Sequence, residues 1–401
     1  MFITPSNLAS YLIIKGLIRA AHVVDGNLAI LQIDRRNRNF KVDLGKGDGL
    51  FVKQVRAFTP DLIDSLRRES ACYHLAGHSP GFASLRPYVP SLLGYDARRH
   101  ILATSLLTAR TLTEFHQSAP CFDARAGRLL GQALGAIHGK TRGTLSEPGD
   151  LVRFPRVRPW ILAGLNSPEL SAPSLADGPK RLVETLAQSP DMQRTLADLY
   201  EQWEIGCYIH GDLRWENVLI SDKPLDGEGR IYVVDWELSD FGDPAWDVAC
   251  VIVAYLFGSV VLGSLQNGAT GSLADVGRAL RDMNAAVPLL REFWKEYRLS
   301  TDIPESAAVT LCQRAMAFIG SRLLLLAFEM AGPLTPATLA APLVFDLARA
   351  ALTDPSFASR LIEMESQPLP VAENGCHGLR GPQEIETQTQ TQRPEPVSDW
   401  R

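Results

Sequence analysis

The sequence lacks the cysteine pattern of a zinc-binding or disulfide-bonded protein. Only six of its 401 residues are cysteine, and no two of them form a Cys-X-X-Cys pair. We therefore expect reduced and mostly buried thiols, as in a cytoplasmic protein. Positive charge is not in excess either, because 40 lysines and arginines stand against 45 aspartates and glutamates, for a net charge of -5. This balance argues against a general nucleic-acid-binding protein.

The chain also lacks a clean apolar run of the kind that crosses a membrane. Its most apolar long segment, Ala307–Met330, contains Arg314 and Arg322, which favours a buried helix over a membrane span. Near the start, Lys15 interrupts the apolar piece Leu12–Ile18 and no small-residue cleavage site follows, so we expect no signal peptide. A hydrophobic content of 46% and a charged content of 21% are those of an ordinary globular protein, and the length allows two packed lobes.

Three short β-rich runs, at 28–33, 40–44 and 50–55, predict strands near the start of the chain. The first two are joined by the polar segment 34–39, which includes Asn37. Such a hairpin tip could cover phosphates with backbone N–H groups and arginines, or it could be an exposed charged turn. The segment has no glycine-rich fingerprint, so both interpretations stay open, with Asn37 as a candidate nucleotide contact.

Lys53 is unusual because it lies within an apolar strand. Alternation places Phe51, Lys53 and Val55 on one face, and a lysine that faces the core needs an anionic partner or a phosphate. The alternative is an edge-strand lysine that deters aggregation. The next predicted helix, 61–75, carries Glu69. A strand lysine paired with a helix glutamate is the arrangement that holds nucleotide phosphates in protein kinases.

Two further runs, Pro87–Tyr95 and Arg99–Leu107, predict another pair of strands. The second run ends where a small lobe would lead into a larger one. Backbone groups near Ser105 and Leu107 could therefore bind the edge of a nucleotide base. After this point the chain is predicted to be mostly helical, apart from a long irregular insert at 143–190.

The segment 208–220 carries the clearest chemical signal. An apolar lead-in is followed by a glycine turn, Asp212 and then Asn217, and a second apolar run, 231–234, ends on Asp235. An aspartate can orient a hydroxyl and accept its proton, while an asparagine and a second aspartate can hold Mg²⁺ on nucleotide phosphates. These residue types in this order predict a phosphoryl-transfer site.

Three motifs follow one another along the chain. They are His210-Gly211-Asp212-Leu213 with Asn217, Val233-Val234-Asp235-Trp236-Glu237, and Gly242-Asp243-Pro244-Ala245-Trp246-Asp247-Val248-Ala249. In these motifs and in their order, the sequence resembles the aminoglycoside phosphotransferase/choline kinase family. The resemblance implies an α+β fold of two protein-kinase-like lobes: a small antiparallel β-rich N-lobe at 1–107 and a mostly helical C-lobe at 108–365. We expect the polar tail, 366–401, to be disordered.

The resemblance also implies a role for each matching residue. Asp212 would be the catalytic base, and Asn217 and Asp235 would bind Mg²⁺. Lys53 would contact the α- and β-phosphates of ATP or GTP, and Glu69 would pair with Lys53.

Three further residues have implied roles outside the chemical step. His210 would brace the loop, and Asp247 would hydrogen-bond the loop backbone from a following helix. Arg214 could offset charge near the transferred phosphoryl group.

The motifs do not specify the acceptor. The first hypothesis is transfer from Mg·NTP to a hydroxyl of a small molecule, and the alternative is a Ser/Thr hydroxyl of a peptide. Residues 307–352 hold only two acidic residues, Glu329 and Asp346, which argues against an aminoglycoside resistance kinase. Retention of the lysine, aspartate and asparagine argues against a pseudokinase. We expect neither a nucleic-acid nor a membrane partner, and the oligomeric state is left open.

Overall fold

The computed structural model defines most of the chain up to residue 354. The described residues all lie in the first of the two units into which the chain divides, Met1–Ile362. The end of the expected C-lobe, 355–365, and the tail expected over 366–401 lie outside them. The described residues are 2–34, 37–45, 47–118, 122–144, 154–170, 175–221, 229–267, 273–332 and 341–354.

A five-stranded antiparallel sheet forms the N-lobe, as predicted. Its strands are hydrogen-bonded in the order β1-β2-β3-β5-β4, so the strand that carries Lys53 is central. The run predicted from Pro87 begins later, at Leu92, because Pro87 and Tyr88 end a 3-10 helix, η1, and proline has no N–H for a strand ladder. The bounds are β1 Ala29–Asp34, β2 Arg38–Gly45, β3 Asp48–Gln54, β4 Leu92–Asp96, β5 Ile101–Ser105 and η1 Pro80–Tyr88.

One face of this sheet packs on the N-terminal helix α1 (Pro5–Ile14). Phe40, Val52 and Ala103 lie opposite one another on three neighbouring strands and join Leu12 of α1 in one apolar cluster. All four side chains are almost fully buried. The first helix therefore closes a small core that is separate from the main one.

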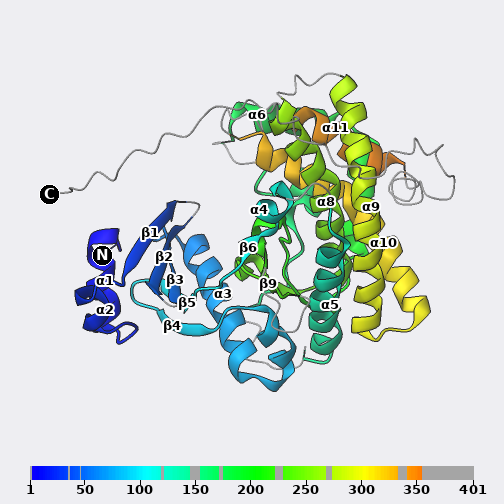
Figure 1. The fold of residues 1–401 in the computed structure, drawn as a ribbon. Helices are drawn as coiled ribbons and strands as arrows, with labels where there is room; N and C mark the ends of the chain where they lie inside the picture. The colour runs from blue at the N-terminus through cyan, green and yellow to red at the C-terminus, as the bar shows by residue number, and fades with distance from the viewer. Residues whose placement is uncertain are drawn as a thin grey trace, which may run out of the picture. The chain divides into compact units, whose positions relative to one another are not determined.

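The other face carries Lys53 and its neighbour on β5, Leu102. It is turned toward helix α3 (Pro60–His78), which carries Glu69. Figure 1 shows α1 and α2 (Ala20–Val24) on one side of the sheet and α3 on the other. Strand alternation thus directs the lysine away from the α1 core and toward α3.

Helices make up most of the C-lobe, and glycines on α5 bring two of them close together. A Cβ added at Gly127 would lie 2.3 Å from the Leu289 carbonyl oxygen, and one at Gly131 would lie 2.3 Å from the Phe293 oxygen, both on α9. Larger residues would force these helices apart. The bounds are α4 Leu112–Gln117, α5 Ala124–Thr141, η2 Trp160–Asn166, α6 Asp177–Ala187, α7 Pro190–Glu201, α8 Pro244–Asn267, α9 Leu273–Thr301, α10 Glu305–Met330 and α11 Ala341–Thr353.

Two small sheets in the C-lobe carry the predicted chemical motifs. One pairs β7 with β10, and the other has the order β6-β8-β9. Two short 3-10 helices flank the β8–β9 pair along the chain: η3 directly precedes β8, and η4 comes after β9. The bounds are β6 Arg110–Thr111, β7 Cys207–Ile209, η3 Trp215–Asn217, β8 Val218–Ile220, β9 Ile231–Val233, η4 Trp236–Leu238 and β10 Asp240–Gly242.

Among the helices described, α10 alone has the length and apolar composition that a membrane crossing requires. In its most apolar 18-residue window, 61% of the residues are buried inside the protein. Arg322, one of the residues that interrupt this segment, is only 3% exposed. The burial agrees with the core helix expected from the sequence.

Candidate active site

The segment 210–217, here called the Asp212 loop, follows β7 through a glycine turn. Gly211 has φ of 84°, and a Cβ at this position would lie 2.7 Å from the Leu238 carbonyl oxygen. The Gly211 carbonyl oxygen accepts a hydrogen bond of 2.9 Å from Trp246 Nε1. Both the left-handed backbone and the close approach therefore require glycine before Asp212.

Asp247, on the first turn of α8, holds the backbone of this loop. Its Oδ2 accepts from the His210 amide at 2.7 Å, and its Oδ1 accepts from the Gly211 amide at 2.8 Å. Oδ2 also lies 3.3 Å from His138 Nε2, and the Asp247 side chain is fully buried. The predicted bracing role of Asp247 is confirmed.

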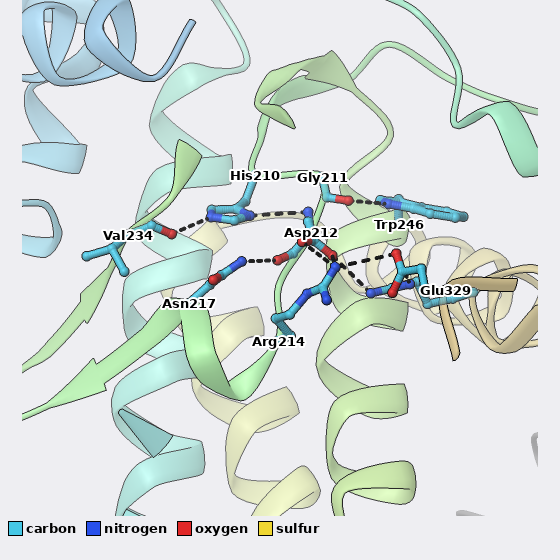
Figure 2. Close-up of polar contacts among 9 residues, drawn as sticks. His210, Gly211, Asp212, Arg214, Asn217, Val234, Trp246 and Glu329 are labelled. Carbon is cyan, nitrogen blue, oxygen red and sulfur yellow. Dashed lines mark hydrogen bonds and ion pairs between the residues drawn. The ribbon is translucent and has the colours of Figure 1, made fainter. Parts of the chain in front are cut away.

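His210 has the geometry of a neutral brace. Its Nδ1 accepts from the Asp212 amide at 3.2 Å, while its Nε2 faces the Val234 carbonyl oxygen at 3.0 Å. A carbonyl can only accept, so Nε2 carries the proton and Nδ1 does not. Figure 2 shows the ring spanning the distance between Val234 and the Asp212 backbone. With both nitrogens engaged, His210 joins the Asp212 loop to the end of β9.

The hairpin of β8 and β9 brings Asn217 and Asp235 to one end. Val218 pairs with Val233, and the Val234 amide donates to the Asn217 carbonyl oxygen at 2.9 Å. Asp235 follows with φ of 66° and ψ of 51°, a left-handed conformation that is uncommon for a residue other than glycine. Such backbone strain persists where the surrounding structure imposes it, and it turns this carboxylate toward Lys53.

Lys53 joins the two lobes. Its Nζ lies 2.7 Å from Glu69 Oε2 and also forms an ion pair with Asp235 Oδ1. Tyr73 donates to the other Glu69 oxygen, Oε1, at 3.0 Å. Lys53 and Glu69 are 5% and 3% exposed, so water does little to stabilise the charge of either side chain. The expected Lys53–Glu69 pair is present, and because β3 is central the edge-lysine interpretation is excluded.

These contacts shift the pKa values of the cluster. Burial raises the pKa of Glu69 to about 7, because Lys53 offsets only part of that effect and the negative charge of nearby Asp235 adds to it. Burial likewise opposes the charge on Asp235, but the adjacent Lys53 outweighs it and holds that pKa below its usual value. The pKa of Lys53 stays raised because two carboxylates surround it. The lysine therefore remains charged, and Glu69 is the member of the trio that titrates near neutrality.

A cavity of about 290 Å³ opens beside this trio. Phe51 and Lys53 share its wall, as alternation predicted, and both Ser105 and Leu107 line it. The Leu107 amide makes no hydrogen bond with the described part of the chain, which leaves it available to a base edge. The lining combines polar side chains, such as Thr104 and Ser105, with an apolar part that suits a nucleotide base. The apolar lining residues include Ile33, Phe51, Leu102, Leu106, Leu107, Leu219 and Val234.

The structure does not bring Asn37 to this cavity. Asn37 is buried, whereas Asn39, which pairs with Lys53 across the β2–β3 ladder, lines the wall. The expected contacts of Arg35 and Arg36 fall outside the described residues. The register of the hairpin, which the sequence left undetermined, decides which of the two asparagines faces the lysine.

Asn217 and Asp235 offer hard oxygen donors of the kind that Mg²⁺ prefers. The Asn217 amide nitrogen donates to the Asp212 carbonyl oxygen at 3.0 Å, so its Oδ1 is left for a ligand. Asp235 is 37% exposed and engages Lys53 through Oδ1. Within the described residues there is no group of three or more His, Cys, Asp or Glu that could hold a metal by itself. A Mg²⁺ ion held by two protein oxygens plus nucleotide phosphates fits this donor set.

The Asp212 carboxylate has two arginine partners that its motif in the sequence does not predict. Asp212 Oδ1 accepts from Arg214 Nη2 at 2.8 Å and from Arg322 Nη2 at 3.0 Å, and Oδ2 lies 2.7 Å from Arg214 Nη2. Burial raises the pKa of Asp212, but the two arginines outweigh it and lower the pKa below its usual value. Glu329 lies 3.4 Å from Arg214 (Figure 2). Arg322 could have been flagged from the sequence, since an arginine inside an apolar helix needs an anionic partner.

A family comparison agrees with this geometry. The model of the phosphotransferase enzyme family (APH) matches residues 28–275, more than half of the chain. The chain belongs to this family. It is therefore a phosphotransferase that acts on hydroxyl groups, as predicted, and the match spans both the Lys53 strand and the Asp212 loop.

Two solved structures of other proteins are similar in fold to this chain. Choline kinase from Cryptosporidium parvum Iowa II is 12% identical, with a TM-score of 0.54, and the match covers 90% of this chain and 99% of that one. The GDP and kanamycin complex of APH(2")-IIia is 13% identical, with a TM-score of 0.50 and coverage of 87% and 98%. At such identities the likeness shows the fold alone, and it confirms the two-lobe α+β class. A search of curated protein sequences found no match.

Proposed function

We propose that this phosphotransferase moves the γ-phosphoryl group of Mg·ATP to a hydroxyl of a small molecule. The observation that carries the proposal is that Lys53, Asn217 and Asp235 line one cavity, and that the Asn217 amide nitrogen donates to the carbonyl oxygen of neighbouring Asp212. Phosphoryl transfer requires positioning and charge neutralisation more than covalent chemistry. A cation beside the phosphates, two oxygen ligands for Mg²⁺ and a nearby carboxylate supply these requirements.

In this proposal the residues divide the work. The cavity walls hold the base, the Leu107 amide binds its edge, and Lys53, kept in place by Glu69, binds the α- and β-phosphates. Asn217 and Asp235 hold the magnesium ion, which when bound neutralises phosphate charge. Asp212 accepts the hydrogen of the acceptor hydroxyl and orients that hydroxyl toward the phosphorus.

Two substitutions separate nucleotide binding from transfer. Asp212→Asn should bind a fluorescent ATP analogue as the wild type does, because Asp212 is not among the described residues that line the cavity. It should lose roughly a thousandfold in acceptor-dependent ADP release, a barrier increase of about 4 kcal/mol. Lys53→Met should weaken nucleotide binding itself. Asp346→Asn, at an exposed ion pair on α11, is the matched control and should retain activity.

The assay would use a panel of alcohols, amino sugars and Ser/Thr peptides, each with ATP or GTP and with or without Mg²⁺. Phosphorylated small molecules in the products support the proposal, and phosphorylated peptides as the only products would assign the acceptor to the peptide class instead. Near wild-type turnover by folded Asp212→Asn, or failure of the wild type to bind either nucleotide, would refute the proposal.

A further inference from the structure

Four charged side chains form a cluster on the side of Asp212 away from the nucleotide. Arg214 and Arg322 both bind the Asp212 carboxylate, and Glu329 lies 3.4 Å from Arg214 and 3.9 Å from Arg322. Among the described residues, those that line the cavity include Asn217 and Asp235 but none of these four. The cluster therefore lies where an acceptor, rather than the nucleotide, would approach Asp212.

The two guanidinium groups have N–H donors without a hydrogen-bond partner among the residues that the structure describes. All the hydrogen bonds of Arg214 use Nη2, and its buried Nε has no partner in the described part of the chain. Arg322 is 3% exposed, yet its Nε and Nη1 are also buried without a hydrogen-bond partner among these residues. The Cys250 thiol forms a side-chain hydrogen bond with Arg322, but a thiol is only a weak acceptor. Buried donors without partners cost free energy, and of the two arginines only Arg214 has a substantial exposed part that an external acceptor could contact.

Exposure distinguishes the two arginines. The Arg214 side chain is 37% exposed and that of Glu329 is 34% exposed, whereas the Arg322 side chain is only 4% exposed. Arg322 is thus buried on α10 and donates to Asp212 Oδ1 from the protein interior. Arg214 lies at the mouth of the cluster, where its exposed part can contact a bound molecule.

We propose that the acceptor carries an anionic group, a carboxylate or a phosphate, next to the hydroxyl that it presents to Asp212, and that Arg214 binds this group. The inference rests on the proposed function and adds the charge class of the substrate. Arg214 would be a specificity-determining residue, and Arg322 a positioning residue that keeps Asp212 in place when Arg214 turns.

The reason is a competition for Asp212 Oδ2. The acceptor hydroxyl must donate to this carboxylate, and Arg214 Nη2 already lies 2.7 Å from Oδ2. If a neutral acceptor displaced Arg214 from Asp212, the positive charge of Arg214 would have Glu329 as its remaining partner. Losing one partner costs free energy because the site is partly buried. An acceptor with its own anionic group gives Arg214 a replacement partner. A polycation would find both carboxylates, Asp212 and Glu329, already paired with arginine.

The test compares four hydroxyl compounds of similar size: glycerate, glycerol 3-phosphate, glycerol and choline. Their binding to wild-type protein loaded with Mg²⁺ and the non-hydrolysable ATP analogue AMP-PNP would be measured by isothermal titration calorimetry, and their phosphorylation would be measured with Mg·ATP. We expect one or both anionic compounds to bind roughly tenfold to a hundredfold more tightly than glycerol, as charge-assisted hydrogen bonds would produce. Choline should bind most weakly. The two anions distinguish a carboxylate-bearing from a phosphate-bearing acceptor.

Variants make the test specific to the cluster. Arg214→Gln should abolish the preference for the anion over glycerol, and Glu329→Gln should increase it by up to about fivefold because Arg214 loses a competing partner. Arg349→Gln, which removes an exposed arginine of α11, controls for the loss of one positive charge and should change neither value.

The proposal falls if glycerol or choline binds as well as both anions, or if the preference survives Arg214→Gln. It also falls if Arg214→Gln lowers turnover equally for charged and neutral acceptors, since the arginine would then serve the transferred phosphoryl group. Failure of the wild-type protein to bind AMP-PNP would instead refute the proposed function.

Discussion

Replacing Asp247 by alanine would remove the one carboxylate that accepts from two successive amides of the Asp212 loop. The amides of His210 and Gly211 and the ring Nε2 of His138 would all lose their acceptor. The site is fully buried, so water cannot replace the carboxylate without a rearrangement. We expect a loss of both stability and turnover from a residue that touches neither the acceptor nor the nucleotide in the proposed reaction.

The size of the effect follows from the number of donors. Each buried donor left unsatisfied costs about 1–3 kcal/mol, so three of them give about 3–9 kcal/mol. That is a large part of a typical folding free energy of about 5–15 kcal/mol. Asp247→Asn should cost less, because one amide can still donate to its single oxygen. The two loop amides bind different oxygens of Asp247, so an asparagine cannot serve both of them.

Urea unfolding, followed at equilibrium, would measure the stability change as a lower midpoint with an unchanged slope. Acceptor-dependent ADP release below the transition would measure turnover. Asp240→Asn is the matched control, since this buried carboxylate accepts from the amides of Arg156 and Val157, outside the loop. We expect the control to lose stability but less turnover. If Asp247→Ala unfolds at the wild-type midpoint, or folds and retains full turnover, the bracing argument is wrong.

Three further changes test other parts of the structure. Burial raises the folded-state pKa of Glu69 from 4.5 to about 7, so the contribution of this group to stability falls as pH rises from about 4.5 to 7. Glu69→Gln should flatten this pH dependence in urea unfolding curves collected across the same range. An unchanged dependence of stability on pH would contradict the assignment. Arg314 binds both oxygens of the fully buried Asp243, at 3.0 and 3.1 Å. Arg314→Met should therefore lower the free energy of unfolding, measured in urea, by about 3–5 kcal/mol. A decrease below about 1 kcal/mol would count against a buried ion pair. Gly211→Ala should reduce turnover severely, because its Cβ would lie 2.7 Å from the Leu238 carbonyl oxygen at positive φ; wild-type kcat would show that the turn can relax.

Much of the active site could be predicted because its members lie in continuous segments. Asp212 and Asn217 flank one turn, and Asp235 ends the partner strand of the same hairpin, so a local pattern of strand, loop and strand brings them together. Strand alternation and chain order made Lys53 and Glu69 candidates for a pair, and the arrangement seen in protein kinases suggested that they pair. The helical pattern and the antiparallel N-lobe were predictable for the same reason, since hydrophobic periodicity reports the local conformation.

Other features depended on packing that no local pattern encodes. Arg322 meets Asp212 across 110 residues of sequence, and Glu329 joins them from the end of the same helix. Periodicity shows that a helix such as α10 has buried positions, but it does not show which loop those positions will face. The hairpin register likewise decided that Asn39, and not Asn37, lines the wall beside Lys53.

The sequence by itself therefore determined the reaction class, because the side chains expected to bind the nucleotide phosphates and Mg²⁺ belong to contiguous strand-and-loop motifs. Only the tertiary structure revealed the two arginines around Asp212, because a charged cluster assembled from a loop and a distant helix exists only when the C-lobe is packed. If the acceptor binds at this cluster, as we propose, the choice of substrate depends on contacts between segments distant in sequence.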